Sequence, residues 1–109
     1  MIGKKKEDFL NEITLQSVIS VKERQFYIDE VDNLFYKRIK RLQDKIIDLT
    51  SSDLIVISLI CLDIDITDCC SLLDVELNTM YIRRKRIKKH IGLSKDDDLE
   101  DWINENIRL

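Results

Sequence analysis

The sequence predicts an all-α protein, and three observations support that fold class. The 109 residues include no proline and only two glycines, whereas all-β folds need frequent turns built on these residues. Charged residues make up 36% of the chain, against about a quarter in an average globular protein. Apolar residues recur at helical spacing, and no segment requires a strand. We expect a helical, coiled-coil-like linker over residues 1–48 and a four-helix domain over residues 49–109.

The first expected helix extends from Glu7 to Asp48, because no glycine or proline interrupts this stretch. A break near Ser17 to Lys22, where the apolar pattern blurs, is an alternative. Steps of four and three residues, as in the a/d seam of a coiled coil, relate five apolar residues near its end: Phe35, Ile39, Leu42, Ile46 and Leu49. The seam either packs on the C-terminal domain of its own chain or makes a dimer, and the sequence leaves both alternatives open.

The second expected helix starts after Leu49 and ends near Leu62. Thr50 or Ser51 is a suitable N-cap, because a side-chain oxygen there accepts a hydrogen bond from a free backbone N–H. Asp53 falls in the first turn, where a negative charge is favourable beside the positive end of the helix dipole. These signals predict that the domain begins at this cap.

A short third helix is expected from about Ile66 to Leu73, capped by Asp65 or Thr67. Residues 74–76 then form a tight turn, and a fourth helix runs from Leu77 or Asn78 to Ile91. Gly92 follows that helix, where a glycine readily takes the left-handed conformation that ends a helix.

Charge is distributed unevenly along these helices. Residues 49–76 contain six acidic residues and no Lys or Arg, whereas residues 77–93 contain no acidic residue and these six cations: Arg83, Arg84, Lys85, Arg86, Lys88 and Lys89. A net charge of -3 over the whole chain therefore does not exclude a polyanionic partner.

A last helix is expected from about Asp96 to Ile107. The acidic run of residues 96–98 lies at its N-terminus, where the helix dipole favours negative charge. Its apolar face consists of Leu99, Trp102, Ile103 and Ile107.

Several classes of protein are excluded or disfavoured. The longest apolar run, Leu54 to Leu62, is far shorter than the roughly 20 residues of a membrane span, and the basic start of the chain lacks the apolar region of a secretory signal. The three cysteines have no zinc-ligand spacing. A single histidine and no Gly-rich loop leave no catalytic set. We expect a cytoplasmic protein that is not an enzyme, with no membrane span, metal or cofactor.

A short helix, a tight turn and a longer basic helix follow one another in the order of a helix-turn-helix unit. A recognition helix must bury one stripe, so that it is held rigidly, and expose cations and small polar groups to phosphates and base edges. The pattern therefore predicts DNA binding. The alternative is a helical interaction module that applies the same basic helix to an acidic protein partner.

Four motifs occur in order within this region. They are Leu49, Thr50 and Asp53; Asp68, Cys69 and Cys70; Thr79 and Met80; and Ile87 followed by Ile91, Gly92 and Leu93. Over Leu49 to about Ile103 they resemble the LuxR/FixJ-type helix-turn-helix effector domain of bacterial transcription regulators. The sequence departs from the family pattern where the usual Gly, Ala and Ser are Asp63, Cys70 and Glu76.

The most similar variant of that family lies at the C-terminus of larger sensor or repeat proteins. Phe35 and Leu42 stand in the place of its aromatic-led coiled segment, and Arg84 and Arg86 in the place of its Arg-x-Arg. One implication of the resemblance is an upstream sensor region outside this chain.

The resemblance implies a DNA-binding transcription regulator that places a basic helix in the major groove as a homodimer. Tyr81, Ile82 and Lys85 match the positions that enter the groove, and the remaining DNA-binding candidates are Asn78, Thr79, Arg83, Arg86 and Lys89. Arg84 differs, because it lies four residues after Met80 and three before Ile87, which places its stem on the inward apolar stripe of the helix. We expect it to snorkel or to pair with Asp53 or Asp68. The dimerisation candidates are Phe35, Ile39, Leu42 and Ile46 of the seam and Leu99, Trp102 and Ile103 of the last helix.

Overall fold

The computed structural model describes residues 18–108, and these residues form helices and connecting turns without a strand. The elements are α2 (Val21–Leu34), α3 (Arg38–Lys45), α4 (Ser51–Cys61), α5 (Ile66–Leu73), α6 (Leu77–Ile91), α7 (Leu99–Ile103) and a π-helical turn η1 (Asn104–Arg108). The all-α prediction is confirmed for this part of the chain. The start of the predicted linker, residues 1–17, lies outside the described residues.

The predicted continuous helix from Glu7 to Asp48 is wrong over its described part, because the chain breaks between α2 and α3. Tyr36 and Lys37 have positive φ angles of 58° and 61°, and a left-handed residue ends a right-handed helix. At its other end α2 begins at Val21 with Ser20 as N-cap. That start lies within the alternative break near Ser17 to Lys22.

A buried carboxylate explains where the second of these helices starts. Asp32, which is 5% exposed, accepts hydrogen bonds at Oδ1 from the backbone N–H groups of Ile39 at 2.9 Å and Lys40 at 3.2 Å. These N–H groups have no intrahelical partner in the first turn of α3. A side chain from one helix thus caps the next, and it does so across a segment without glycine or proline.

The helices predicted between residues 50 and 91 are confirmed. Thr50 and Asp53 form a reciprocal capping box at the start of α4, in which each side chain accepts from the other residue's backbone N–H. Asp65 accepts from the N–H of Asp68 at the start of α5, as expected for an N-cap. At the far end of α6, Gly92 has a φ of 93°.

The last helix begins three residues later than predicted. Asp98 is the N-cap of α7, and its side chain accepts from the N–H of Asp101 at 3.0 Å. Asp97 instead accepts from the N–H of Ser94 at 2.8 Å. The acidic run therefore divides its carboxylates between a loop turn and the helix cap, which shortens the helix.

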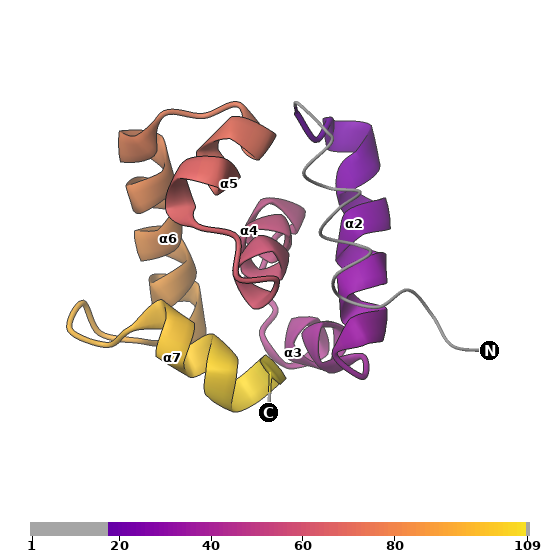
Figure 1. The fold of residues 1–109 in the computed structure, drawn as a ribbon. Helices are drawn as coiled ribbons and strands as arrows, with labels where there is room; N and C mark the ends of the chain where they lie inside the picture. The colour runs from indigo at the N-terminus through magenta and orange to yellow at the C-terminus, as the bar shows by residue number, and fades with distance from the viewer. Residues whose placement is uncertain (1–17, 109) are drawn as a thin grey trace.

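Helix α4 lies at the centre of the molecule, with α2 on one side and α5 and α6 on the other, and α7 across one end (Figure 1). Val31 of α2, Ile55 of α4, Ile87 of α6 and Ile103 of α7 are fully buried in the same core. The backbone N–H of Ile19 also donates to the carbonyl of Leu72. The predicted linker and the predicted domain thus share one core over the described residues.

The predicted dimerisation residues contribute to that same core. Ile39, Leu99 and Ile103 are at most 5% exposed, whereas four others pack against the core and keep part of their surface exposed: Phe35, Leu42, Ile46 and Trp102. This packing corresponds to the alternative in which the seam covers its own chain. The dimer contact stays a prediction.

Candidate nucleic-acid interface

One face of α6 is exposed to solvent along most of its length. Asn78, Tyr81, Ile82, Lys85 and Lys89 are all exposed, with Tyr81 55% and Ile82 59% exposed. Steps of three and four residues place these side chains on the same side of a helix. These five side chains therefore share one outward face, and their contact with DNA stays a prediction.

The opposite side of α6 is fixed to the core. Met80 and Ile87 are fully buried, and they lie seven residues apart, two helical turns along the inward stripe. Thr79 and Arg83, the remaining DNA-binding candidates on the first half of the helix, are partly exposed at its edges. The helix thus presents its outer face on a rigid support.

A buried carboxylate connects α6 to the start of α4. Asp53 is 0% exposed, and its Oδ2 lies 2.9 Å from His90 Nδ1 while its Oδ1 accepts from Arg86 Nη2 at 3.4 Å. Burial by itself raises the pKa of Asp53, but hydrogen bonds from Thr50 and His90 outweigh it, so the pKa lies below its usual value. The ionised carboxylate holds the C-terminal half of α6 in place.

Arg86 therefore differs from the other cations among the predicted DNA-binding residues. Its side chain is 45% exposed, and its guanidinium pairs with the buried Asp53. The sequence did not predict this pair or the contact of His90 with the same carboxylate. Arg86 lies 33 positions and His90 37 positions after Asp53, and such distant residues meet only in the folded chain.

Arg84 lies inward, as predicted, with 17% of its side chain exposed. The predicted partners are wrong: its Nη1 lies 3.5 Å from Glu100 Oε1 of α7. Asp53 is occupied by Arg86 and His90, and Asp68 is exposed in the first turn of α5. Arg84 also faces α5, where burial raises the pKa of the Cys69 thiol to about 11 and the nearby guanidinium opposes that rise.

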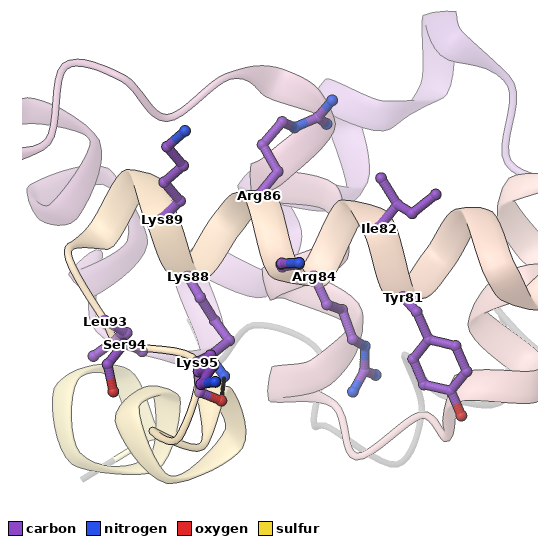
Figure 2. Close-up of a pocket in the computed structure, with 10 residues that line it drawn as sticks. Tyr81, Ile82, Arg84, Arg86, Lys88, Lys89, Leu93, Ser94 and Lys95 are labelled. Carbon is purple, nitrogen blue, oxygen red and sulfur yellow. Dashed lines mark hydrogen bonds between the residues drawn. The ribbon is translucent and has the colours of Figure 1, made fainter.

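An open groove of about 700 Å³ runs along α6 and the loop that follows it (Figure 2). It contains the predicted Tyr81, Ile82, Lys85, Arg86 and Lys89. Its lining also includes five residues that were not predicted as DNA-binding: Arg84, Lys88, Leu93, Ser94 and Lys95. The one available signal for Lys95 was a cation three residues after the helix-ending glycine, in an otherwise acidic stretch.

Other kinds of site find no support in the described part of the chain. Within residues 18–108, no group of three or more His, Cys, Asp or Glu side chains is arranged to hold a metal ion. Cys61 and Cys69 are buried, and burial raises the pKa of the Cys69 thiol to about 11, which disfavours the reactive thiolate. No helix among these residues is both long and apolar enough to cross a membrane.

No family model, curated protein or solved structure matches the chain. The similarity to the LuxR/FixJ-type domain thus stays a prediction from the motif residues quoted above. Some of these residues have a clear structural role, because Thr50 and Asp53 cap α4 and Gly92 ends α6. Asp63 has a positive φ of 60°, which is the conformation that a glycine takes most easily.

Proposed function

We propose that this protein binds double-stranded DNA by placing the exposed face of α6 in the major groove, and that it acts as a transcription regulator. Helix α5, the turn over residues 74–76 and helix α6 have the order of a helix-turn-helix unit, and α4 lies behind them. A similarity to the LuxR/FixJ-type effector domain forms part of this proposal.

The observation that carries the proposal is the combination of charge and exposure on α6. The segment from Leu77 to Leu93 contains no acidic residue, while Lys85 and Lys89 are exposed on the same face as Asn78 and Tyr81. Cations attract phosphates without regard to sequence, and small polar or apolar groups read base edges. Both kinds of group lie together on a helix that buried side chains hold in place.

The dimensions of α6 suit the major groove of DNA. Its 15 residues span about 22 Å, and a helix with its side chains is about 10–12 Å wide, similar to the major groove at about 12 Å. Tyr81 and Ile82 suit contact with a thymine methyl, Asn78 suits an adenine edge, and Lys85 suits a guanine edge or a phosphate.

A salt titration of binding to a short random duplex tests the proposal. If about five cations neutralise phosphates, the slope of log K against log salt is about -4.5. The double variant Lys85→Gln/Lys89→Gln lowers its magnitude by about 1.8. The matched variant Lys40→Gln/Lys45→Gln, which removes two exposed cations from α3, leaves it unchanged. No binding at low salt, or equal effects of the two variants, contradicts the proposal.

A homodimer is the proposed binding form, because a single module of this size binds DNA only weakly at physiological salt. Phe35, Leu42, Ile46 and Trp102 keep exposed surface next to the core and are the candidates for the contact. Sedimentation of the protein with and without duplex DNA is expected to show two protein chains on each bound duplex. One chain per site at every protein concentration overturns the dimer.

A second candidate function is supported by apolar exposure at the start of α6. Leu77, Tyr81 and Ile82 are 46%, 55% and 59% exposed, and exposed apolar residues beside cations also suit an acidic protein partner. Binding to polyglutamate without binding to duplex DNA would favour this alternative.

A further inference from the structure

We propose that the loop after α6 forms a second wall of the DNA site, in which Lys95 acts with Lys88 on the phosphates of one DNA strand. This inference rests on the proposed function and deepens it. It adds two residues that the sequence motifs do not include, and it assigns one edge of α6 to the sugar-phosphate backbone.

The first support is the position of the loop against the helix. Lys88 Nζ donates to the backbone carbonyl of Lys95 at 2.9 Å. Both residues line the groove together with Tyr81, Arg84, Lys85 and Ser94, and Figure 2 shows the Lys88 side chain reaching toward the loop at Lys95. Cations from two separate elements therefore line one groove.

The second support is that several hydrogen bonds hold the loop. Gly92 turns the chain with its positive φ, and the N–H of Leu93 then donates to the carbonyl of Lys88 at 2.8 Å. The Asp97 carboxylate accepts from the N–H of Ser94 at 2.8 Å, and Leu99 is buried in the core. A loop that is already ordered loses little conformational entropy when it binds.

The third support is the position of the acidic side chains. Among the described residues that line the groove, none is acidic. Asp97 is engaged by Ser94, and Asp98 caps α7. Glu100 is 63% exposed and pairs with Arg84. Asp96 is exposed beside Lys95, and neither it nor these other carboxylates is among the residues that line the groove.

The exposed face of α6 also changes character along its length. Its first half carries the uncharged Asn78, Tyr81 and Ile82, whereas its second half carries Lys85 and Lys89. Lys95 adds a cation at this second end. The first half suits base edges and the second half suits phosphates, so contacts by Lys88 and Lys95 are expected to strengthen binding equally on all sequences.

Salt titrations of single variants test this inference. Lys95→Gln is the main variant, because the backbone carbonyl that accepts from Lys88 remains in place. We expect it to lower the magnitude of the salt slope by about 0.9, equally on two unrelated duplexes. Lys88→Gln removes the hydrogen bond to the Lys95 carbonyl as well as a cation, so it is expected to lower the magnitude of the slope at least as much. The matched control is Lys22→Gln, which removes an exposed cation from α2 and is expected to leave the slope unchanged. Urea midpoints of all variants check that the fold is intact.

The outcomes separate this inference from the proposed function. If the wild-type protein does not bind duplex DNA at low salt, both fail. If the wild type binds with a steep slope but Lys95→Gln behaves as Lys22→Gln does, only the second wall is wrong. An effect of Lys95→Gln on one duplex sequence alone also overturns it, because phosphate contacts do not depend on sequence.

Discussion

Helices α4 and α6 lie side by side, and the protein uses them in opposite ways. Every residue of α4 from Asp53 to Cys61 is buried, whereas Met80 and Ile87 are the buried residues of the longer α6. The helix that packs on all sides supplies stability, and the helix that packs along one narrow stripe has most of its surface left for a partner.

The two helices also differ in what holds their ends. At the start of α4, the capping box of Thr50 and Asp53 provides hydrogen-bond acceptors for backbone N–H groups from within the same short segment. Glu76, the N-cap residue of α6, makes no side-chain cap bond, and α6 is instead tied to α4 near its other end through Asp53 and His90. The position of α6 therefore depends on tertiary contacts more than on local signals.

The largest effect is expected from a cavity in α4. Ile57→Ala removes a side chain that is 1% exposed, and such changes lower the free energy of unfolding by about 2–5 kcal/mol. Ile82→Ala, the matched change on the exposed face of α6, is expected to alter it by less than about 0.5 kcal/mol. Urea denaturation measures both, and similar losses would contradict the division of roles.

A smaller effect is expected at the junction between the two helices. Asp53→Asn removes charge-assisted hydrogen bonds to His90 and Arg86 and is expected to lower the free energy of unfolding by about 2 kcal/mol near neutral pH. Asp96→Asn, an exposed carboxylate on the following loop, is the control and is expected to have little effect.

The stability difference between the wild type and Asp53→Asn is expected to depend on pH. The folded-state pKa of Asp53 lies below its usual value, so this group contributes stability above the unfolded pKa of about 4 and loses it as the pH falls through the folded value. The difference between wild type and Asp53→Asn is therefore expected to shrink below about pH 4. A difference that stays constant down to pH 2 would exclude the ionised carboxylate as its source.

A smaller loss of stability is expected from a substitution at the end of α6. Gly92 has a φ of 93°, and a Cβ there would meet no atom within 4 Å. The cost of Gly92→Ala is thus backbone strain alone, about 1 kcal/mol. Thermal and urea denaturation measure it. A neutral result would mean that the loop after α6 relaxes without strain, and that it is less firmly held than the proposed second wall requires.

The smallest effect is expected in the turn before α6. Asp74 has a φ of 53°, where glycine is favoured, so Asp74→Gly is expected to raise the free energy of unfolding by about 0.5 kcal/mol. Asp74→Ala removes the same charge without the backbone freedom and serves as its control. Equal stability of the two variants would show that strain at this position is negligible.

The sequence predicts some helices better than others, for a physical reason. The bounds of α5 and α6 followed from local signals, namely the cap at Asp65 and the glycine at residue 92. The break between α2 and α3 did not, because it depends on the Asp32 carboxylate reaching the N–H of Ile39 seven residues later. Neither glycine nor proline marks the place where the chain turns.

The candidate site divides in the same way. The family resemblance indicated Tyr81, Ile82 and Lys85 as outward positions, and the structure exposes them on one face together with Asn78 and Lys89. The partner of Arg84 was not predictable, because Glu100 belongs to another helix. Of the two expected partners, Asp53 pairs with Arg86 and His90, and Asp68 is exposed to solvent. The place of Lys95 beside Lys88 likewise depends on how the loop folds back.

The sequence by itself determined the helical class, the outward face of α6 and the concentration of positive charge on it, since these follow from composition and from a period of 3.6 residues. Tertiary structure alone decided that the linker helix α2 joins the core, that a buried Asp53 holds α6 through Arg86 and His90, and that a loop lysine extends the basic surface. These features depend on contacts between residues far apart in the chain, and such contacts leave no periodic or local signal.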